Sequence, residues 1–155
     1  RQRHLTIPCE MCIRDSRDMG RNAAGVYGIR LHKDDAVVGM GVAKTDKEKK
    51  RSYQILIIMA QGYGKRTELS LYKLQGRGGS GIKTAKVTDK TGDITNAFLV
   101  NADSMDERDL IIISNNGQVI RTPFKTVSLL GRDTQGVRIM RFKDNDDRVS
   151  GVTWI

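Results

Sequence analysis

The sequence predicts an all-β fold, a propeller-like array of repeated four-stranded blades. A frame of the form Gly-Arg-x-x-x-Gly-(Val/Ile), called the box below, begins at Gly20, Gly76 and Gly131, so successive copies lie 56 and 55 positions apart. The apolar run 55–58 recurs at 110–113 with the same offset. A fixed period of this size is typical of solenoids and propellers.

Single residues keep the offset as well. Three identical pairs lie 55 positions apart, namely Gly62 and Gly117, Arg66 and Arg121, and Thr67 and Thr122. An apolar residue also follows the first glycine of each box by 18 positions, at Val38, Ile94 and Val149. We therefore expect three repeats, at about 17–54, 55–109 and 110–155.

In the first repeat, 26–31 alternates apolar and polar residues and predicts a half-buried strand. A turn at 32–35 and a second strand at 36–42 follow, and the charge run 44–52 predicts a solvated connection between repeats.

The second repeat opens on the continuous apolar run 55–60, which is short enough for a strand buried on both faces. A hairpin turn is expected at 61–64, then a strand at 65–71 whose Thr67, Leu69 and Leu71 face inward. Beyond the box we expect strands at 82–87 and 94–100, separated by a turn at 89–92.

The third repeat copies this order, with Asn115-Asn116-Gly117 as its hairpin turn. Its expected strands are 119–123, 137–142 and 149–155 beside the apolar run, which brings each full unit to about four strands, as in a propeller blade.

Residues 1–16 do not join the repeat, and we expect them to be disordered or non-native, since 11–16 resembles translated adapter sequence. Cys9 and Cys12 form half of a zinc or redox motif, but a zinc site needs four ligands and His4 is the one nearby candidate. We therefore expect no metal site, and no catalytic Ser/His/Asp set or P-loop stands out either.

The chain carries 27 basic and 18 acidic residues, a net charge of +9 with a pI near 9.8. Such an excess favours a polyanionic partner, while the alternative is a basic surface that binds nothing. Residues 61–90 hold seven basic and two acidic side chains, whereas 91–113 hold one and five. Because the blades are built alike, the basic halves should line up on one rim, which suits a DNA backbone.

The composition also indicates where in the cell the protein is expected to be. With no apolar run near 18 residues, no membrane span is expected, and no signal peptide is recognised at the start. The two cysteines argue against a disulfide scaffold. A reducing cytoplasm fits this composition.

The second box is the most glycine-rich. Its loop comprises Gln75, Gly76, Arg77, Gly78, Gly79, Ser80 and Gly81. Exposed amides beside an arginine can cradle phosphate, while the alternative is a flexible turn.

Together, 17–31, 62–67 and 131–137 resemble the last blades of the C-terminal domain of bacterial DNA gyrase A, over about 17–155. The resemblance implies a β-pinwheel of six blades whose neighbours exchange strands, of which this chain would hold about two and a half.

The family's signature box, Gln-basic-basic-Gly-Gly-basic-Gly, belongs to its first blade. The second box here supplies Gln75, Arg77, Gly78, Gly79 and Gly81 but has Gly76 and Ser80 where the signature has basic residues. It resembles a degenerate box of a late blade, so the role of the first-blade box is not carried over.

The resemblance implies a non-catalytic part of an ATP-dependent type II topoisomerase that wraps double-stranded DNA around a basic rim and so supports negative supercoiling. Its partners would be DNA, the rest of gyrase A and gyrase B in the bacterial cytoplasm and nucleoid, with no membrane or small-molecule substrate. ATP and Mg²⁺ would act elsewhere in the enzyme, so no cofactor is expected here. The tyrosines are interpreted as packing or rim residues, at Tyr27, Tyr53, Tyr63 and Tyr72.

We expect phosphate contacts from Lys65, Arg66, Arg77, Arg121 and Arg132, followed by Arg21. Two alternatives remain: the matching domain of topoisomerase IV, or a propeller that binds an acidic protein. At residue level, Arg77 can instead pack between blades against Asp93 or Asp103.

Overall fold

The computed structural model describes residues 19–43, 53–105 and 107–155. Within these ranges the regular structure is almost entirely antiparallel sheet, which confirms the all-β prediction. The strands are β1 (Tyr53–Met59), β2 (Tyr63–Glu68), β3 (Ile94–Asn101), β4 (Asp109–Ser114), β5 (Val119–Pro123), β6 (Val137–Arg138) and β7 (Val149–Trp154). One short helix, α1 (Ala102–Met105), follows β3. No helix in these ranges is long and apolar enough to cross a membrane.

The second and third repeats fold alike, as the constant offset predicts. Each begins with a hairpin whose first strand is also paired with the last strand of its repeat, β3 or β7. The equivalent features are the pairs Ile55–Thr67 and Leu110–Thr122, the bulges at Ile58/Met59 and Ile113/Ser114, and the one-turn 3₁₀ helices Leu69–Leu71 and Phe124–Thr126.

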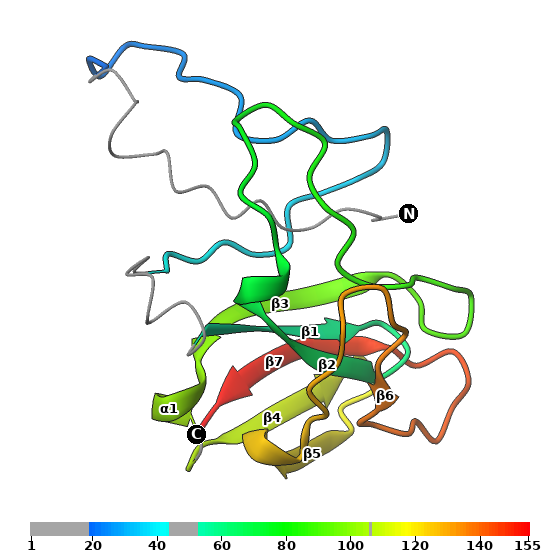
Figure 1. Ribbon diagram of the computed structural model, residues 1–155. Coiled ribbons are helices and arrows are strands. Elements are labelled where there is room, and N and C mark those ends of the chain that lie inside the picture. Colours follow the sequence, from blue (N-terminus) through cyan, green and yellow to red (C-terminus); the bar gives the residue numbers. More distant parts are fainter. Residues whose placement is uncertain (1–18, 44–52, 106) are drawn as a thin grey trace.

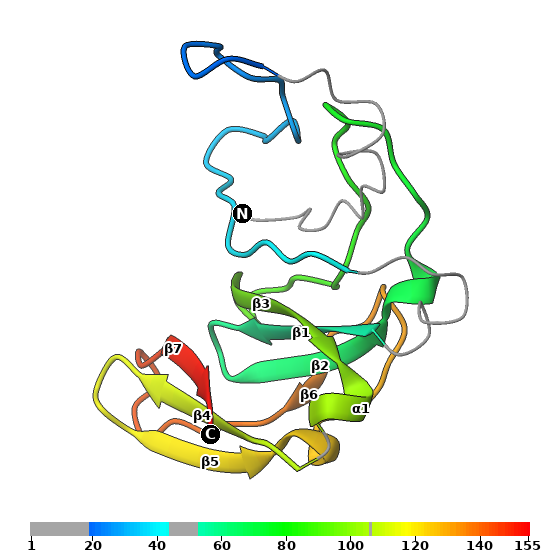
Figure 2. The ribbon, with the colours of Figure 1, turned by 90° about the vertical axis from the view of Figure 1, so that its left-hand side faces the viewer.

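The two repeats are joined by strand exchange. One sheet has the order β3-β1-β2-β6 and the other β5-β4-β7, so the fourth strand of the second repeat's sheet, β6, comes from the third repeat. Tyr63 and Gly64 of β2 pair with Arg138 and Val137 of β6. The two sheets lie one above the other, and segment 19–43 of the first repeat lies beyond the β1-containing sheet (Figures 1 and 2).

The core explains why 55–60 is apolar without interruption. Ile55, Ile57 and Met59 point into one hydrophobic cluster, and Leu56 and Ile58 point into the other, all at most 2 % exposed. The prediction of a strand buried on both faces is therefore confirmed.

Several expected strands are wrong. No strand forms at 26–31, 36–42 or 82–87, and the expected strand 137–142 shortens to β6. The predicted half-buried face at 26–31 is wrong as well, because these residues are exposed except for Ile29. Alternation alone supplies no hydrogen-bonding neighbour, and the bridge described for the first repeat is Ile29 with Gly79.

The end of the second hairpin strand also differs from the expectation. Thr67 and Leu69 are buried as expected, but Leu71 is 46 % exposed. The 3₁₀ helix at Leu69–Leu71 breaks the period of two that would have turned Leu71 inward. The predicted tail 1–16 and the charge run 44–52 lie outside the described residues.

Candidate nucleic-acid interface

The three boxes share one backbone feature. Their last glycines, Gly25, Gly81 and Gly136, have φ values of 79°, 78° and 79°, a left-handed conformation that favours glycine. At Gly136 the spacing is also tight, because a Cβ there would lie 2.7 Å from the carbonyl oxygen of Gly64 in β2. Glycine at this position therefore allows the third box to lie directly against the second repeat.

Each of the last two boxes is hydrogen-bonded to the repeat before it. The Arg30 N–H donates to the Gly79 carbonyl at 2.9 Å, and the Lys86 N–H donates to the Thr134 carbonyl at 3.0 Å. Gly79 and Thr134 are 55 positions apart, so the two contacts are equivalent. We call these contact regions the 1/2 joint and the 2/3 joint. The boxes are thus built into the joints between repeats.

Lys65 differs from its predicted role as a DNA contact. Its side chain is fully buried, and Nζ donates to the carbonyls of Gly131 and Arg132, at 2.7 and 2.5 Å, and to the Thr134 hydroxyl at 3.0 Å. Burial lowers the pKa of Lys65 to about 8, although the negative charge of Asp133 offsets part of this shift. Lys65 therefore holds the third box through bonds made in the protein interior, and its buried amine is not accessible to a phosphate.

Arg66 is likewise engaged within the protein. Its Nε donates to the Val127 carbonyl at 2.6 Å, a second nitrogen donates to Gln54 Oε1 at 3.2 Å, and the guanidinium lies 4.6 Å from the Phe124 ring centroid. It is half-buried. These contacts tie the third repeat to β2, and the predicted phosphate contact of Arg66 stays a prediction.

Arg121, the equivalent of Arg66 one repeat later, is exposed. Its side chain is 65 % exposed and forms an ion pair of 2.5 Å with Asp109 across the β4–β5 hairpin. Arg121 is thus available on the surface, and its predicted phosphate contact stays a prediction.

Arg132 lies in the third box at the 2/3 joint. Its guanidinium lies 5.7 Å from the ring of the buried Tyr72, and it donates to the Lys83 carbonyl at 3.3 Å. Burial raises the pKa of Tyr72, while its hydroxyl is bonded to Thr84 at 2.5 Å. A neutral ring held in this way gives the half-buried arginine a fixed position at the joint.

The two remaining predicted residues belong to the other boxes. Arg77 is half-buried, Arg21 is exposed, and the loop of the second box lies beside Gly28 through an N–H donated by Gly78 at 3.0 Å. Gln75 bonds locally, to the Leu74 carbonyl. The contacts of Arg77 and Arg21 with DNA, and the cradle function of this loop, stay predictions.

Sequence reasoning missed a second group of cations at the 2/3 joint. Lys83, Lys86 and Lys90 are exposed on the segment after the second box, and Arg138 is exposed on β6, where it shares the Tyr63 ring with Lys90. Arg138 donates to the Tyr63 hydroxyl at 2.9 Å, with its guanidinium 5.1 Å from the ring, while the Lys90 amine lies 6.0 Å from the same ring. The positive balance of 61–90 was the signal that could have singled out the three lysines, whereas Arg138 lies outside that range.

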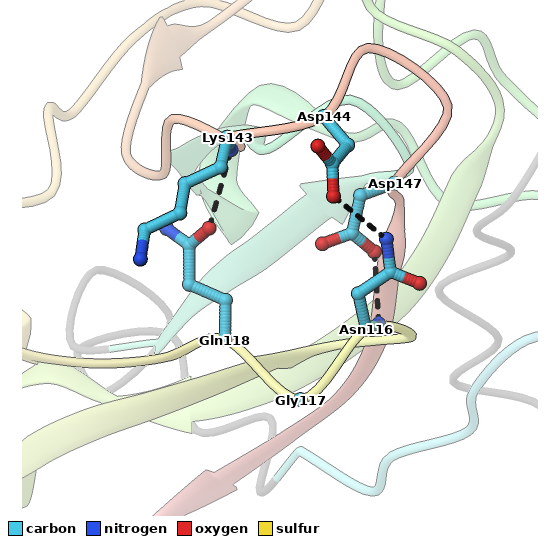
Figure 3. A pocket seen from close by; sticks show the side chains of 6 residues that line it. All are labelled: Asn116, Gly117, Gln118, Lys143, Asp144 and Asp147. Carbon is cyan, nitrogen blue, oxygen red and sulfur yellow. Dashed lines mark hydrogen bonds between the residues drawn. The ribbon is translucent and has the colours of Figure 1, made fainter.

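A surface pocket of about 220 Å³ lies elsewhere, at the β4–β5 turn, lined by Asn116, Gly117, Gln118, Lys143, Asp144 and Asp147 (Figure 3). Burial alone would raise the pKa of Asp147, but hydrogen bonds from Ser114 and from neighbouring backbone N–H groups hold it below its ordinary value. Two carboxylates and one lysine line the pocket, a balance that disfavours a phosphate there.

A metal site was not expected from the sequence. Among the described residues, no group of three or more His, Cys, Asp or Glu side chains is arranged to hold a metal ion. His4, Cys9 and Cys12 lie outside those residues.

The sequence has clear relatives. It is 43% identical over 128 residues to DNA gyrase A of Staphylococcus epidermidis (strain ATCC 12228 / FDA PCI 1200), covering 83% of this chain and 13% of the relative. DNA gyrase A of Ureaplasma parvum serovar 3 is 37% identical, covering 86% of this chain and 15% of the relative. The chain therefore spans about one seventh of the length of these curated relatives.

Solved structures agree on the fold. The structure of a DNA gyrase A C-terminal domain aligns with a TM-score of 0.67 and 28% identity, over 90% of this chain and 44% of that one. The C-terminal domain of a DNA topoisomerase IV aligns with a TM-score of 0.71 over 85% of this chain and 38% of that one, but at 16% identity it supports the fold alone.

The family described as DNA gyrase C-terminal domain, beta-propeller, matches this chain in three segments, 17–44, 54–101 and 108–153. These segments cover well over half of the sequence and contain all three boxes. Together with the gyrase A relatives and the strand-exchanged sheets, this match means that the chain belongs to the DNA gyrase C-terminal domain family.

Proposed function

We propose that the chain binds double-stranded DNA without sequence preference, through phosphate contacts made at the joints between its repeats. The observation that carries the proposal is that cations gather on both sides of the 2/3 joint. Lys83, Lys86 and Lys90 are exposed on the second repeat, and Arg132 and Arg138 lie on segments of the third repeat that bond to it, at the Lys83 carbonyl and the Tyr63 hydroxyl. Lysine and arginine side chains neutralise phosphates without reading bases.

The arrangement of these cations also favours a backbone contact. Arg132 is positioned by Tyr72 and Arg138 by Tyr63, so two guanidinium groups are held in place before a ligand arrives. An arginine held in this way loses little side-chain entropy on binding and can fork onto two phosphate oxygens. Family membership supports the same ligand, since the relatives are named as parts of DNA gyrase.

In the longer protein we propose that this region wraps DNA and contributes no catalytic residue. DNA cleavage, ATP and Mg²⁺ would be handled elsewhere in gyrase A and in gyrase B, with negative supercoiling as the shared result in the bacterial cytoplasm. The matching domain of topoisomerase IV is disfavoured, because the gyrase A domain is 28% identical to this chain and the topoisomerase IV domain 16%.

The test is a salt titration with the 155-residue chain and two duplexes of unrelated sequence. We expect log affinity to fall linearly with log salt concentration, with the same slope for both duplexes. Arg132→Ala should make the slope less steep by about one unit for both duplexes, because one phosphate contact is lost.

Arg108→Ala is the matched control, since it removes the same charge from an exposed position in the acidic half of the blade. Its slope should equal that of the wild type. If neither duplex binds while an acidic protein ligand does, the protein-binding alternative replaces this proposal. If Arg132→Ala lowers only the melting temperature, Arg132 acts as a packing residue and not as a DNA contact.

A further inference from the structure

The 1/2 and 2/3 joints share one backbone contact but differ at the third position of the box. That position is Gly78 in the second box and Asp133 in the third, 55 positions later. The residue of the preceding repeat that corresponds to Lys83 is Tyr27, 56 positions earlier. The 2/3 joint therefore has both a carboxylate and an amine at a place where the 1/2 joint has neither.

Asp133 and Lys83 face each other across the 2/3 joint. The Asp133 Oδ1 atom lies 2.7 Å from the Lys83 Nζ atom, with the side chains 66 % and 49 % exposed. The hydrogen bond from Lys83 is the main reason that the pKa of Asp133 is lowered, and the positive charges of Lys86 and Lys65 lower it further. The carboxylate is thus ionised and surrounded by amines.

A carboxylate in this position resembles a bound phosphate, because both are anions whose oxygens accept hydrogen bonds from amines. Since the pair is solvent-exposed, the attraction between Asp133 and Lys83 is weak, and the phosphates of a duplex can compete for the amine. A phosphate that arrives must nevertheless overcome the repulsion of the carboxylate that already occupies the place.

We propose that Asp133 is a built-in competitor for phosphate, which pairs with Lys83 and so weakens DNA binding at the 2/3 joint. The inference rests on the proposed DNA-binding function. In the free chain the Asp133 carboxylate offsets part of the Lys83 charge, so Lys83 adds less to the electrostatic attraction of DNA than an unpaired lysine would. Without the carboxylate, Lys83 would contribute a full phosphate contact. Asp133 therefore sets how tightly this joint holds DNA.

The experiment is a double-mutant cycle with Asp133→Asn and Lys83→Gln, read out as duplex affinity over a range of salt concentrations. Asp133→Asn should tighten binding about three- to ten-fold at low salt and steepen the salt slope by about one unit. Lys83→Gln should change the wild type by less than about two-fold, yet it should remove most of the gain in the Asp133→Asn background.

Asp103→Asn, in α1, is the matched control because it removes one exposed carboxylate away from the boxes. It should alter affinity by less than about two-fold. Melting temperatures of all variants show whether the third box keeps its stability, because an aspartate that only braces the loop would lower both the melting temperature and the affinity when replaced.

Additive effects of the two substitutions, or an equal gain from Asp103→Asn, would overturn the inference while leaving DNA binding by the wild type intact. Loss of duplex binding in every protein, the wild type included, would instead overturn the DNA-binding function and the inference with it. The inference is supported if duplex affinity rises only in variants that carry Asp133→Asn and if Lys83→Gln removes most of that rise.

Discussion

β1 and β4 occupy the same place in successive repeats and have nearly the same apolar sequence, yet they are buried differently. Ile58 in β1 is fully buried, whereas its equivalent Ile113 in β4 is 37 % exposed. Both strands are central in their sheets, so hydrogen bonding does not account for the difference. The difference lies in what covers the two faces of each strand.

One face of β1 packs against side chains that include Val38 of the first repeat, and the other packs against the third repeat. β4 directs Leu110 and Ile112 toward the second repeat, and its opposite face is partly open. The comparison teaches that a strand in this array owes its burial to the repeats on either side of it. The apolar run itself is a property of the repeat and is present in both strands.

The largest expected effect is at the matched pair Ile58 and Ile113. Ile58→Ala should lower the free energy of unfolding by about 3 kcal/mol or more, because it empties a fully buried site between two repeats. Ile113→Ala should cost less than about 1 kcal/mol, since part of that side chain is already in water. Urea denaturation of both variants checks this, and equal costs would contradict the comparison.

The next effect concerns Lys65, whose equivalent in the third repeat is the apolar Ile120. The folded pKa of about 8 lies below the ordinary value of 10.5, so between these pH values the unfolded chain holds the proton more strongly. The stability of the wild type relative to Lys65→Met should therefore rise from pH 8 to 10.5, by up to about 3 kcal/mol.

Urea denaturation of both proteins at several pH values measures this difference, and the other titrating groups cancel in the subtraction. The relative stability should be flat below about pH 8, where Lys65 is charged in both states. A flat difference across the whole range would mean that the buried amine titrates as an ordinary lysine.

The smallest effect contrasts Arg66 with its equivalent, Arg121. Arg66→Ala should cost about 2 kcal/mol, because the carbonyl of Val127 loses a charged donor and the Phe124 ring loses its stacked guanidinium. Arg121→Ala should cost less than about 1 kcal/mol, since it removes an exposed ion pair with Asp109. Thermal melts of the two variants measure both effects, and a larger loss at Arg121 would reverse the order.

Much of this fold could be predicted from the sequence because each repeat carries its own strand and turn signals. The offset of 55 positions predicted the paired hairpins, and the apolar run 55–60 predicted a strand buried on both faces. The pattern at 26–31 predicted a strand and was wrong, since alternation describes one segment while a strand requires a partner from elsewhere.

The candidate interface was less predictable for a related reason. Lys65 and Arg66 have the composition of a DNA contact, but their side chains bond to atoms of 125–134, some 60 positions later. A basic residue type cannot distinguish a carbonyl of the next repeat from a phosphate. The lysines at 83, 86 and 90 were apparent as charge, but the meeting of Lys90 and Arg138 at the Tyr63 ring depends on the exchanged strand β6.

The exchanged strand also bears on how the chain is made. Because β6 completes the sheet of the second repeat, the Tyr63–Gly64 end of β2 keeps an open edge until Val137 and Arg138 have been synthesised, well after β3. An open strand edge is a template for pairing with other chains. We therefore expect the second repeat to be most prone to aggregation during translation while that edge is open, and the third repeat to end this interval when it arrives.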